Sequence, residues 1–288
     1  MRPELATKRL WRPFIDIGDS TVFRLGFGAM RIVGAPSIFG APADRSVAHA
    51  VLRRAVEAGT TLIDTADAYG PGTSEELIAE ALHPYDEHVL IATKGGLERP
   101  SAEQWRRNAR PEHLRSACEA SLRRLRVECI DLYQLHAIDP DVPLEESMGA
   151  LFELQREGKI RYVGVSNFSV NELERARKLG GIVSVQNRYS FAQRGDEEMV
   201  QYCEKHQLAY LPWGPLSEGH VASMNALAYV AKQHGATPTQ VALAWLLSHS
   251  PVILPIPGTS NPAHLEENLG TRELVLTTED MQHLDNAV

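Results

Sequence analysis

The sequence lacks the features that define several protein classes. Its three cysteines, Cys118, Cys129 and Cys203, have neither an even count nor zinc-site spacing, which argues against a disulfide framework and a structural metal site. No apolar run is long enough to span a bilayer, and the first fourteen residues lack the continuous apolar segment of a signal peptide. We therefore expect a protein of the reducing cytoplasm with no membrane partner and no bound metal.

Positive charge is also scarce, because the formal net charge is -8. This balance argues against binding to nucleic acid or to an anionic membrane surface. The arginine-rich segment 106–126 contains interleaved glutamates and is interpreted as a solvated helix face. The glycine-rich fingerprint of a dinucleotide-binding doubly wound sheet is absent, since Gly26-Phe27-Gly28 continues as Ala29-Met30-Arg31.

From Arg24 onward the chain alternates short apolar runs with longer amphipathic segments, which is the pattern of repeated βα units. Eight strands are predicted, at Leu25–Phe27, Leu62–Asp64, Val89–Thr93, Ile130–Leu135, Tyr162–Val165, Ile182–Val185, Ala209–Pro212 and Val252–Leu254. Helices are predicted between and after them, including one at Thr73–Leu82 that begins with a Thr73/Glu76 capping box and one at 111–125 that begins with proline.

Eight strands and at least eight helices in roughly 250 residues are typical of a (β/α)8 TIM barrel. We expect one α/β domain over residues 1–288, with the barrel proper at about 24–275. In this fold the active site lies at the carboxyl ends of the strands, where the loops converge. The residues predicted there are Asp64, Tyr69, Lys94, His136, Ser166, Asn167, Gln186, Asn187 and Trp213.

Each of these residues also has a structural interpretation. Asp64, in the stretch LIDTADAYGPG, could begin a turn or cap a helix, and His136 alone could satisfy backbone groups. A carboxylate, a phenol, an ammonium and an imidazole on neighbouring strand ends are a rarer combination. Taken together, the four favour catalysis.

The ordered series resembles the aldo-keto reductase family, whose members are TIM barrels that bind NADPH and reduce carbonyl groups. The similar segments are RLGFGAM, DTADAYG, ATKGG, DLYQLHAID, GVSNFS, VQNRYS and PIPGTSNPAHLEENL. The resemblance implies a catalytic tetrad of Asp64, Tyr69, Lys94 and His136. Tyr69 would protonate the carbonyl oxygen, which near neutral pH requires its pKa of about 10 to be lowered. Lys94, held by Asp64, would stabilise the phenolate, and His136 would orient the carbonyl.

The resemblance also implies the cofactor contacts. The amide and hydroxyl groups of Ser166, Asn167 and Gln186 would bind the nicotinamide carboxamide, and Trp213 would stack on the ring. The remaining contacts are expected at Gly28, Ala29, Met30, Asp64, Gly214, Pro215, Leu216, Ser217, Pro257, Gly258, Thr259, Ser260, Asn261, His264, Glu267 and Asn268. Gly258 and His264 stand where many members have Lys and Arg for the 2′-phosphate. NADPH is the expected cofactor, and NADH is less favoured.

The substrate is expected to be a small carbonyl compound in an open pocket lined by Met30, Phe39 and Trp105 together with Tyr69 and His136. The connection from residue 216 to residue 225 is short and the chain ends soon after residue 278, so no long lid or flap is expected. The loop MRIVGAPSIFGAP is similar to that of bacterial members related to pyridoxal reductases, which makes pyridoxal the first substrate to test.

Two other functions remain open. Lys94 could form a Schiff base, as in class I aldolases. Some relatives of the family act as nucleotide-sensing subunits of channels and keep the tetrad. Metal-dependent hydrolysis is a less favoured function, because His136 lacks the companion ligands that a metal needs.

Overall fold

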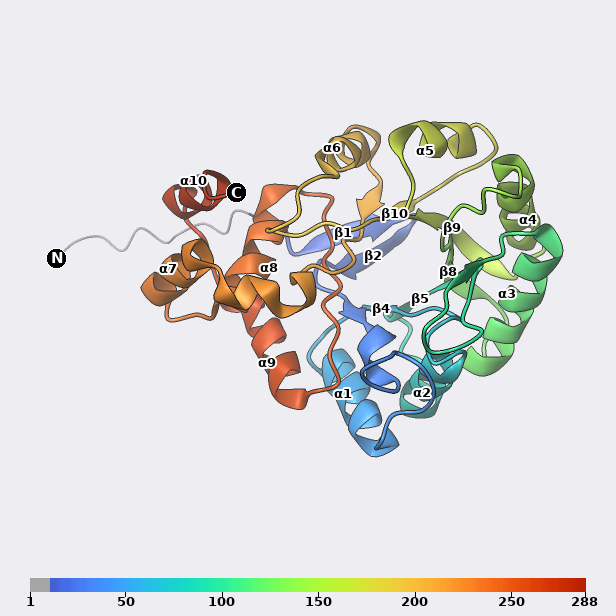
Figure 1. Cartoon of the computed structure of the whole chain (residues 1–288), viewed down its shortest axis with the longest axis horizontal. Coiled ribbons are helices and arrows are strands. Elements are labelled where there is room, and N and C mark those ends of the chain that lie inside the picture. Colours follow the sequence, from blue (N-terminus) through green and yellow to red (C-terminus); the bar gives the residue numbers. More distant parts are fainter. Residues whose placement is uncertain (1–10) are drawn as a thin grey trace.

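The computed structural model describes residues 11–288, so the first ten residues of the predicted domain lie outside the described part. One parallel sheet curls into a barrel and is surrounded by helices (Figure 1). The strand order is β11-β10-β9-β8-β5-β4-β3. In chain order these strands are β3 (Phe27–Gly28), β4 (Leu62–Asp64), β5 (Leu90–Gly95), β8 (Ile130–Leu135), β9 (Ile160–Ser166), β10 (Ser184–Gln186) and β11 (Ala209–Tyr210).

The predicted eighth strand is wrong as a regular strand, although the chain does close the barrel there. Ile253 forms only an isolated bridge with Tyr210. On the other side, Gly26 and Gly28 donate their N–H groups to the carbonyls of Pro255 (2.9 Å) and Pro257 (3.4 Å). The two prolines have no N–H to return, so the segment 252–257 cannot form a continuous ladder.

The helices that alternate with the strands confirm the predicted rhythm. Pro111 begins α3, as the sequence indicates for a residue whose missing N–H is not needed in a first turn. The helices are α1 (Arg45–Glu57), α2 (Thr73–Leu82), α3 (Pro111–Leu125), α4 (Leu144–Arg156), α5 (Val170–Arg177), α6 (Glu197–His206), α7 (Asn225–His234), α8 (Pro238–His249), α9 (Pro262–Gly270) and α10 (Thr278–Asp285), with short 3-10 helices η1 (Ala29–Ile32), η2 (Ser217–Ser223) and η3 (Thr271–Glu273).

The capping box predicted at the start of α2 is wrong. Gly72, not Thr73, is the N-cap residue, and it makes no side-chain cap. The Thr73 hydroxyl instead donates to the carbonyl of Gly70 at 2.6 Å. Gly72 adopts φ 79°, which a glycine reaches without steric cost, so the turn forms without a capping side chain.

Two hairpins were not predicted. The first, β1 (Phe14–Ile17) with β2 (Ser20–Phe23), buries Ile17 and Val22 among residues at the starts of barrel strands, such as Leu62. It therefore covers the amino-terminal end of the barrel. The second, β6 (Leu97–Glu98) with β7 (Arg106–Arg107), follows β5 at the opposite end, beside the predicted active site.

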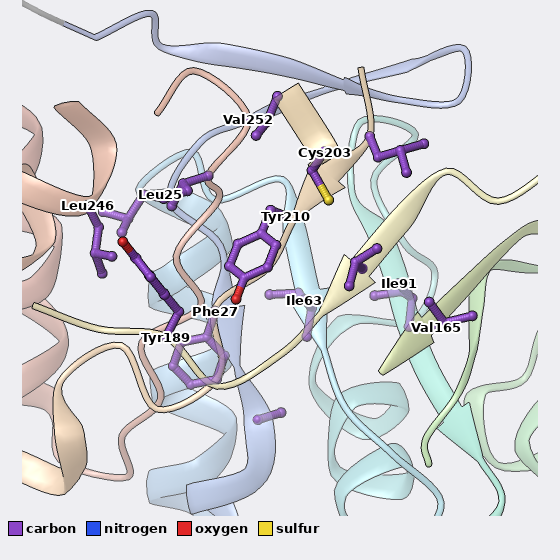
Figure 2. Close-up of a cluster of buried hydrophobic side chains, with 14 of the residues drawn as sticks. Leu25, Phe27, Ile63, Ile91, Val165, Tyr189, Cys203, Tyr210, Leu246 and Val252 are labelled. Carbon is purple, nitrogen blue, oxygen red and sulfur yellow. The ribbon is translucent and has the colours of Figure 1, made fainter. Parts of the chain in front are cut away.

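Besides the cluster under the first hairpin, a larger apolar layer lies between the sheet and the helices. Figure 2 shows Phe27, Ile63, Ile91 and Val165 from the strands in one cluster with Leu246 of α8. All are at most 4% exposed. Burial of this kind stabilises by about 25 cal/mol per Å² of apolar surface, and it fixes the strand ends that carry the polar residues.

Candidate active site

Asp64 and Lys94 form a buried ion pair on the neighbouring strands β4 and β5. Lys94 Nζ donates to the two carboxylate oxygens at 2.9 and 2.8 Å and to the carbonyl of Thr65 at 2.7 Å. Lys94 is 0% exposed and Asp64 is 2% exposed. Burial alone would lower the pKa of Lys94, but the charge of Asp64, together with interactions with Tyr69, outweighs burial, and the pKa is raised. Lys94 is therefore a fixed cation.

Two amides complete the surroundings of Asp64. Gln186 Nε2 donates to Oδ1 at 2.8 Å, and Gln134 Nε2 donates to the same atom at 3.3 Å. Gln186 was predicted as a carboxamide contact, and in the structure its side-chain N–H group donates to Asp64. Gln134 was missed, although a polar residue inside the apolar strand β8, in register with Lys94, is a usable signal. Asp64 is thus held by three donor side chains.

Tyr69 lies in the turn after β4 with its ring 5.2 Å from Lys94 Nζ. Burial raises the pKa of the phenol, and the charge of Lys94 opposes this without cancelling it. The expectation that Lys94 brings the pKa of Tyr69 below its ordinary value is therefore wrong, because the phenol is only 7% exposed and loses the water that would solvate a phenolate. Tyr69 keeps its proton at neutral pH.

His136 follows β8 and faces Tyr69, with ring centroids 6.0 Å apart and planes at 82°. Burial, aided by the charge of Lys94, holds the pKa of His136 well below its ordinary value. The imidazole is therefore neutral at pH 7 and carries one N–H donor. Within residues 11–288 its buried Nδ1 has no hydrogen-bond partner.

The predicted pocket residues Phe39 and Trp105 are joined by an arginine that the sequence did not reveal. The Arg99 guanidinium lies 4.1 Å from the Trp105 ring centroid and 5.6 Å from that of Phe39, and it donates to backbone carbonyls of both loops. Trp105 also meets His136 edge-on at 6.4 Å and is 46% exposed. Met30 lies in η1, directly after β3, at the same end of the barrel.

Asn167 links His136 to Trp213. Its Nδ2 donates to the carbonyl of His136 at 2.9 Å and to Ser166 Oγ at 3.1 Å. Its Oδ1 accepts a hydrogen bond from Trp213 Nε1 at 3.0 Å. Ser166 in turn donates to the carbonyl of Gln186 at 2.8 Å. The residues predicted to bind a carboxamide are thus brought together between the main chain of His136 and the indole of Trp213.

The predicted pyrophosphate loop follows Trp213. Gly214 has φ 62°, and Ser217 adopts φ 46°. The Ser217 hydroxyl is already bonded to Ser190 Oγ at 2.6 Å, Pro215 is buried and Leu216 packs against the core. Backbone N–H groups, more than side chains, are therefore the donors that this loop can offer to an anion.

The predicted adenosine segment begins with a glycine pair. A side chain at Gly258 would collide with the carbonyl oxygen of Gly28, and a Cβ at Gly28 would lie 2.6 Å from the carbonyl oxygen of Ile256. This close backbone approach explains why a basic residue is absent at position 258. Ala29 and Pro257 are buried beside the pair.

The rest of the segment forms the start of α9. Thr259 Oγ1 accepts from the N–H of Asn261 at 3.0 Å, and Asn261 Oδ1 caps the helix by accepting from Ala263 N at 2.8 Å. Ser260 and His264 are exposed. Glu267 is half-buried with its carbonyl bonded to Gln240, and Asn268 is buried. Ser260, His264 and the helix N-terminus are the groups that an anion could reach.

Other parts of the described chain offer weaker candidates for a functional site. A surface hollow of about 630 Å³ lies between the carboxyl ends of α3 and α4, at the opposite end of the barrel from the tetrad. Lys159 and Glu119, which line it, form an ion pair at 2.6 Å. Among residues 11–288, no three His, Cys, Asp or Glu side chains gather as metal ligands. In the same part of the chain, no helix has the length and apolar character needed to cross a membrane.

Comparison with known proteins identifies the family. The family model described as Aldo/keto reductase family matches residues 24–288. An uncharacterized oxidoreductase of Schizosaccharomyces pombe is 42% identical over 272 residues, which cover 94% of this chain and 88% of that protein. Pyridoxine 4-dehydrogenase of Escherichia coli K12 is 40% identical over 275 residues, which cover 93% and 96%.

A solved structure agrees with this result. The aldo/keto reductase from Klebsiella pneumoniae, in complex with NADP and acetate, superposes with a TM-score of 0.82 at 27% identity. The match covers 96% of this chain and 95% of that chain. The barrel, the residues at its carboxyl end and the matches along the sequence agree, and the chain belongs to the aldo/keto reductase family.

Proposed function

We propose that the protein reduces aldehydes or ketones to alcohols with NADPH as hydride donor and Tyr69 as general acid. The observation that carries the proposal is the arrangement of a protonated phenol between a fixed cation and a neutral imidazole. Lys94 Nζ lies 5.2 Å from the Tyr69 ring, and the His136 ring lies 6.0 Å from it.

Each residue then has a defined task. NADPH, when bound, supplies the hydride that attacks the carbonyl carbon. Tyr69 gives its proton to the carbonyl oxygen as the hydride arrives, because that oxygen then becomes alkoxide-like and is basic enough to take a proton even from a phenol of raised pKa. The nearby charge of Lys94 stabilises the phenolate that remains. The neutral His136 donates a hydrogen bond to the same oxygen and fixes its direction. Asp64 keeps Lys94 charged and in place through two contacts under 3 Å.

The residues present fit a nicotinamide cofactor. Polar atoms of Ser166, Asn167 and Gln186 converge beside the half-buried indole of Trp213, as amide recognition with ring stacking requires. The N-terminus of α9, with Ser260 and His264, offers the positive end of a helix dipole to a phosphate. We propose NADPH over NADH, supported by the NADP complex of the Klebsiella pneumoniae relative.

Pyridoxal and similar aromatic aldehydes are the proposed substrates. One relative is named pyridoxine 4-dehydrogenase. The wall of Phe39, Arg99 and Trp105 offers aromatic faces at the mouth of the site. A Schiff-base role for Lys94 is disfavoured, because that chemistry needs a neutral amine and here the pKa of Lys94 is raised.

The decisive experiment compares the wild type with Tyr69→Phe. We expect NADPH-dependent reduction of pyridoxal or an aromatic aldehyde to fall at least ~100-fold, which corresponds to loss of a general acid. NADPH binding, followed by quenching of tryptophan fluorescence, should be retained, and NADH should bind more weakly than NADPH.

Other outcomes separate the alternatives. Near-normal turnover by Tyr69→Phe would remove Tyr69 as the proton donor, and equal or tighter binding of NADH would overturn the cofactor assignment. Borohydride trapping of a carbonyl substrate on Lys94 would favour an aldolase. Tight nucleotide binding without turnover of any carbonyl tested would favour a sensing subunit.

A further inference from the structure

Asn187 follows Gln186 at the end of β10 and is 6% exposed. Its side chain hydrogen-bonds both backbone groups of Phe168, a residue of the loop that follows the neighbouring strand β9. Oδ1 accepts from Phe168 N at 3.1 Å, and Nδ2 donates to Phe168 O at 2.7 Å. The amide therefore acts as a two-point clamp on a single residue, much as a paired strand would.

An acid holds the clamp in place. Asn187 Nδ2 also donates to Asp196 Oδ2 at 2.9 Å, and the hydroxyl of the buried Tyr210 donates to the same oxygen at 2.7 Å. Asp196 is the N-cap residue of α6, yet its side chain makes no cap hydrogen bond. Replacing a capping side chain costs roughly 0.5–2 kcal/mol, so this carboxylate forgoes a favourable contact at the helix and bonds Asn187 instead.

The clamped residue adjoins Asn167, which adopts φ 60°. A non-glycine residue with positive φ persists only where its neighbours hold it. From this conformation Asn167 reaches the carbonyl of His136 and the indole N–H of Trp213. The main chain of Asn187 also contacts Trp213, whose backbone N–H donates to the Asn187 carbonyl at 2.9 Å.

We propose that Asn187 is a positioning residue of the active site. Through Phe168 it fixes Asn167, and Asn167 in turn fixes the positions of His136 and Trp213. We infer that these positions leave room for the carbonyl group beside His136 and for the nicotinamide ring beside Trp213. Asp196 and Tyr210 hold Asn187 in the required orientation. The inference rests on the proposed function for the roles of His136 and Trp213, whereas the clamp itself is a matter of structure.

The test uses the full-length protein and three variants. Asn187→Ala removes the clamp, and Tyr210→Phe removes one hydrogen bond that supports it. Tyr85→Phe is the matched control, since it also removes one tyrosine hydroxyl, here bonded to Leu125 O at 2.8 Å at the other end of the barrel. For each protein we would measure kcat and KM with an aromatic aldehyde, the Kd for NADPH, and amide exchange in residues 166–170.

Asn187→Ala should lower kcat about tenfold or more, in line with the cost of a small displacement at a reacting centre. Its Kd for NADPH should rise and the Phe168 amide should exchange faster. Tyr210→Phe should show the same changes in weaker form. Tyr85→Phe should lose a similar amount of thermal stability with kcat, Kd and exchange in 166–170 unchanged.

The inference is overturned if Asn187→Ala and Tyr210→Phe keep wild-type kcat, Kd and exchange, or if Tyr85→Phe changes them equally. If Asn187→Ala does not fold, Tyr210→Phe against Tyr85→Phe decides. A wild type without carbonyl reductase activity would refute the proposed function alone. NADPH affinity and amide exchange would then still decide whether Asn187 positions this region.

Discussion

Lys94 and Arg24 are two cations with 0% exposure at different ends of the barrel, and different groups accept their hydrogen bonds. Lys94 has a carboxylate at 2.8 Å. Arg24 donates to backbone carbonyls, including those of Ile253 at 2.9 Å and Ser250 at 2.5 Å, and no ion pair of it is found within residues 11–288. Burial lowers the pKa of Arg24 to about 10, whereas the pKa of Lys94 is raised.

The difference shows what each buried charge does. The guanidinium has five N–H groups, and through it Arg24 joins the segment 247–253 to the backbone of Arg12. Lys94 contacts one acid and one carbonyl, and its charge acts on the phenol of Tyr69. A buried cation bonded to carbonyls joins backbone segments, and one bonded to an acid next to a phenol serves chemistry.

The largest expected effect comes from Lys94→Met. We expect turnover to fall by about 10³-fold, the scale of lost acid catalysis, and the free energy of unfolding to fall by about 3–5 kcal/mol because Asp64 is left buried without its counter-ion. The double variant Asp64→Asn/Lys94→Met should recover most of the stability and none of the turnover. Steady-state kinetics and urea unfolding measure both effects. If the double variant stays as unstable as the single one, the pair is not an ion pair of the kind described.

Arg24→Met should show the opposite pattern. Several buried carbonyls lose their donor, so the free energy of unfolding should fall by about 3 kcal/mol, while kcat stays at the wild-type value below the unfolding transition. Arg24→Lys, with three donors, should recover part of the stability. A large loss of kcat in folded Arg24→Met would break the comparison, because it would mean that the amino-terminal end of the barrel controls the tetrad.

The smallest effect concerns His136, which the charge of Lys94 helps to keep neutral. The pKa of His136 is lower in the folded protein than in the unfolded chain, so the unfolded chain binds more protons below pH 6.5. Stability therefore falls as pH drops below about 6.5, by up to about 1.4 kcal/mol per pH unit. His136→Gln should lose less stability than the wild type between pH 7 and pH 5 in urea unfolding. Equal losses would show that the imidazole titrates freely.

The sequence predicted those parts that depend on local pattern. Alternating apolar runs indicated the barrel, and the strand ends indicated the pairing of Asp64 with Lys94. Contacts between residues far apart in the sequence could not be predicted from it. Two examples are the Pro255 and Pro257 carbonyls, which close the barrel without a strand, and Arg99, which stacks between two loops.

The pKa of Tyr69 was mispredicted for a related reason. The sequence shows that a positive charge at Lys94 would lower the pKa of Tyr69. The loss of solvent around the Tyr69 ring has a larger, opposite effect on that pKa, and it is visible only in the folded structure. Gln134 shows the same limit, because its role depends on its register with Lys94.

The backbone contact between Gly28 and Gly258 restricts how the nucleotide end of the site can change. Position 258 admits no side chain, since the obstacle is the carbonyl of Gly28 rather than a movable side chain. A mutational path towards tighter phosphate binding through this segment therefore needs positions other than 258, such as the exposed Ser260 and His264. The contact that closes the barrel thus also determines which substitutions are available for altering cofactor preference.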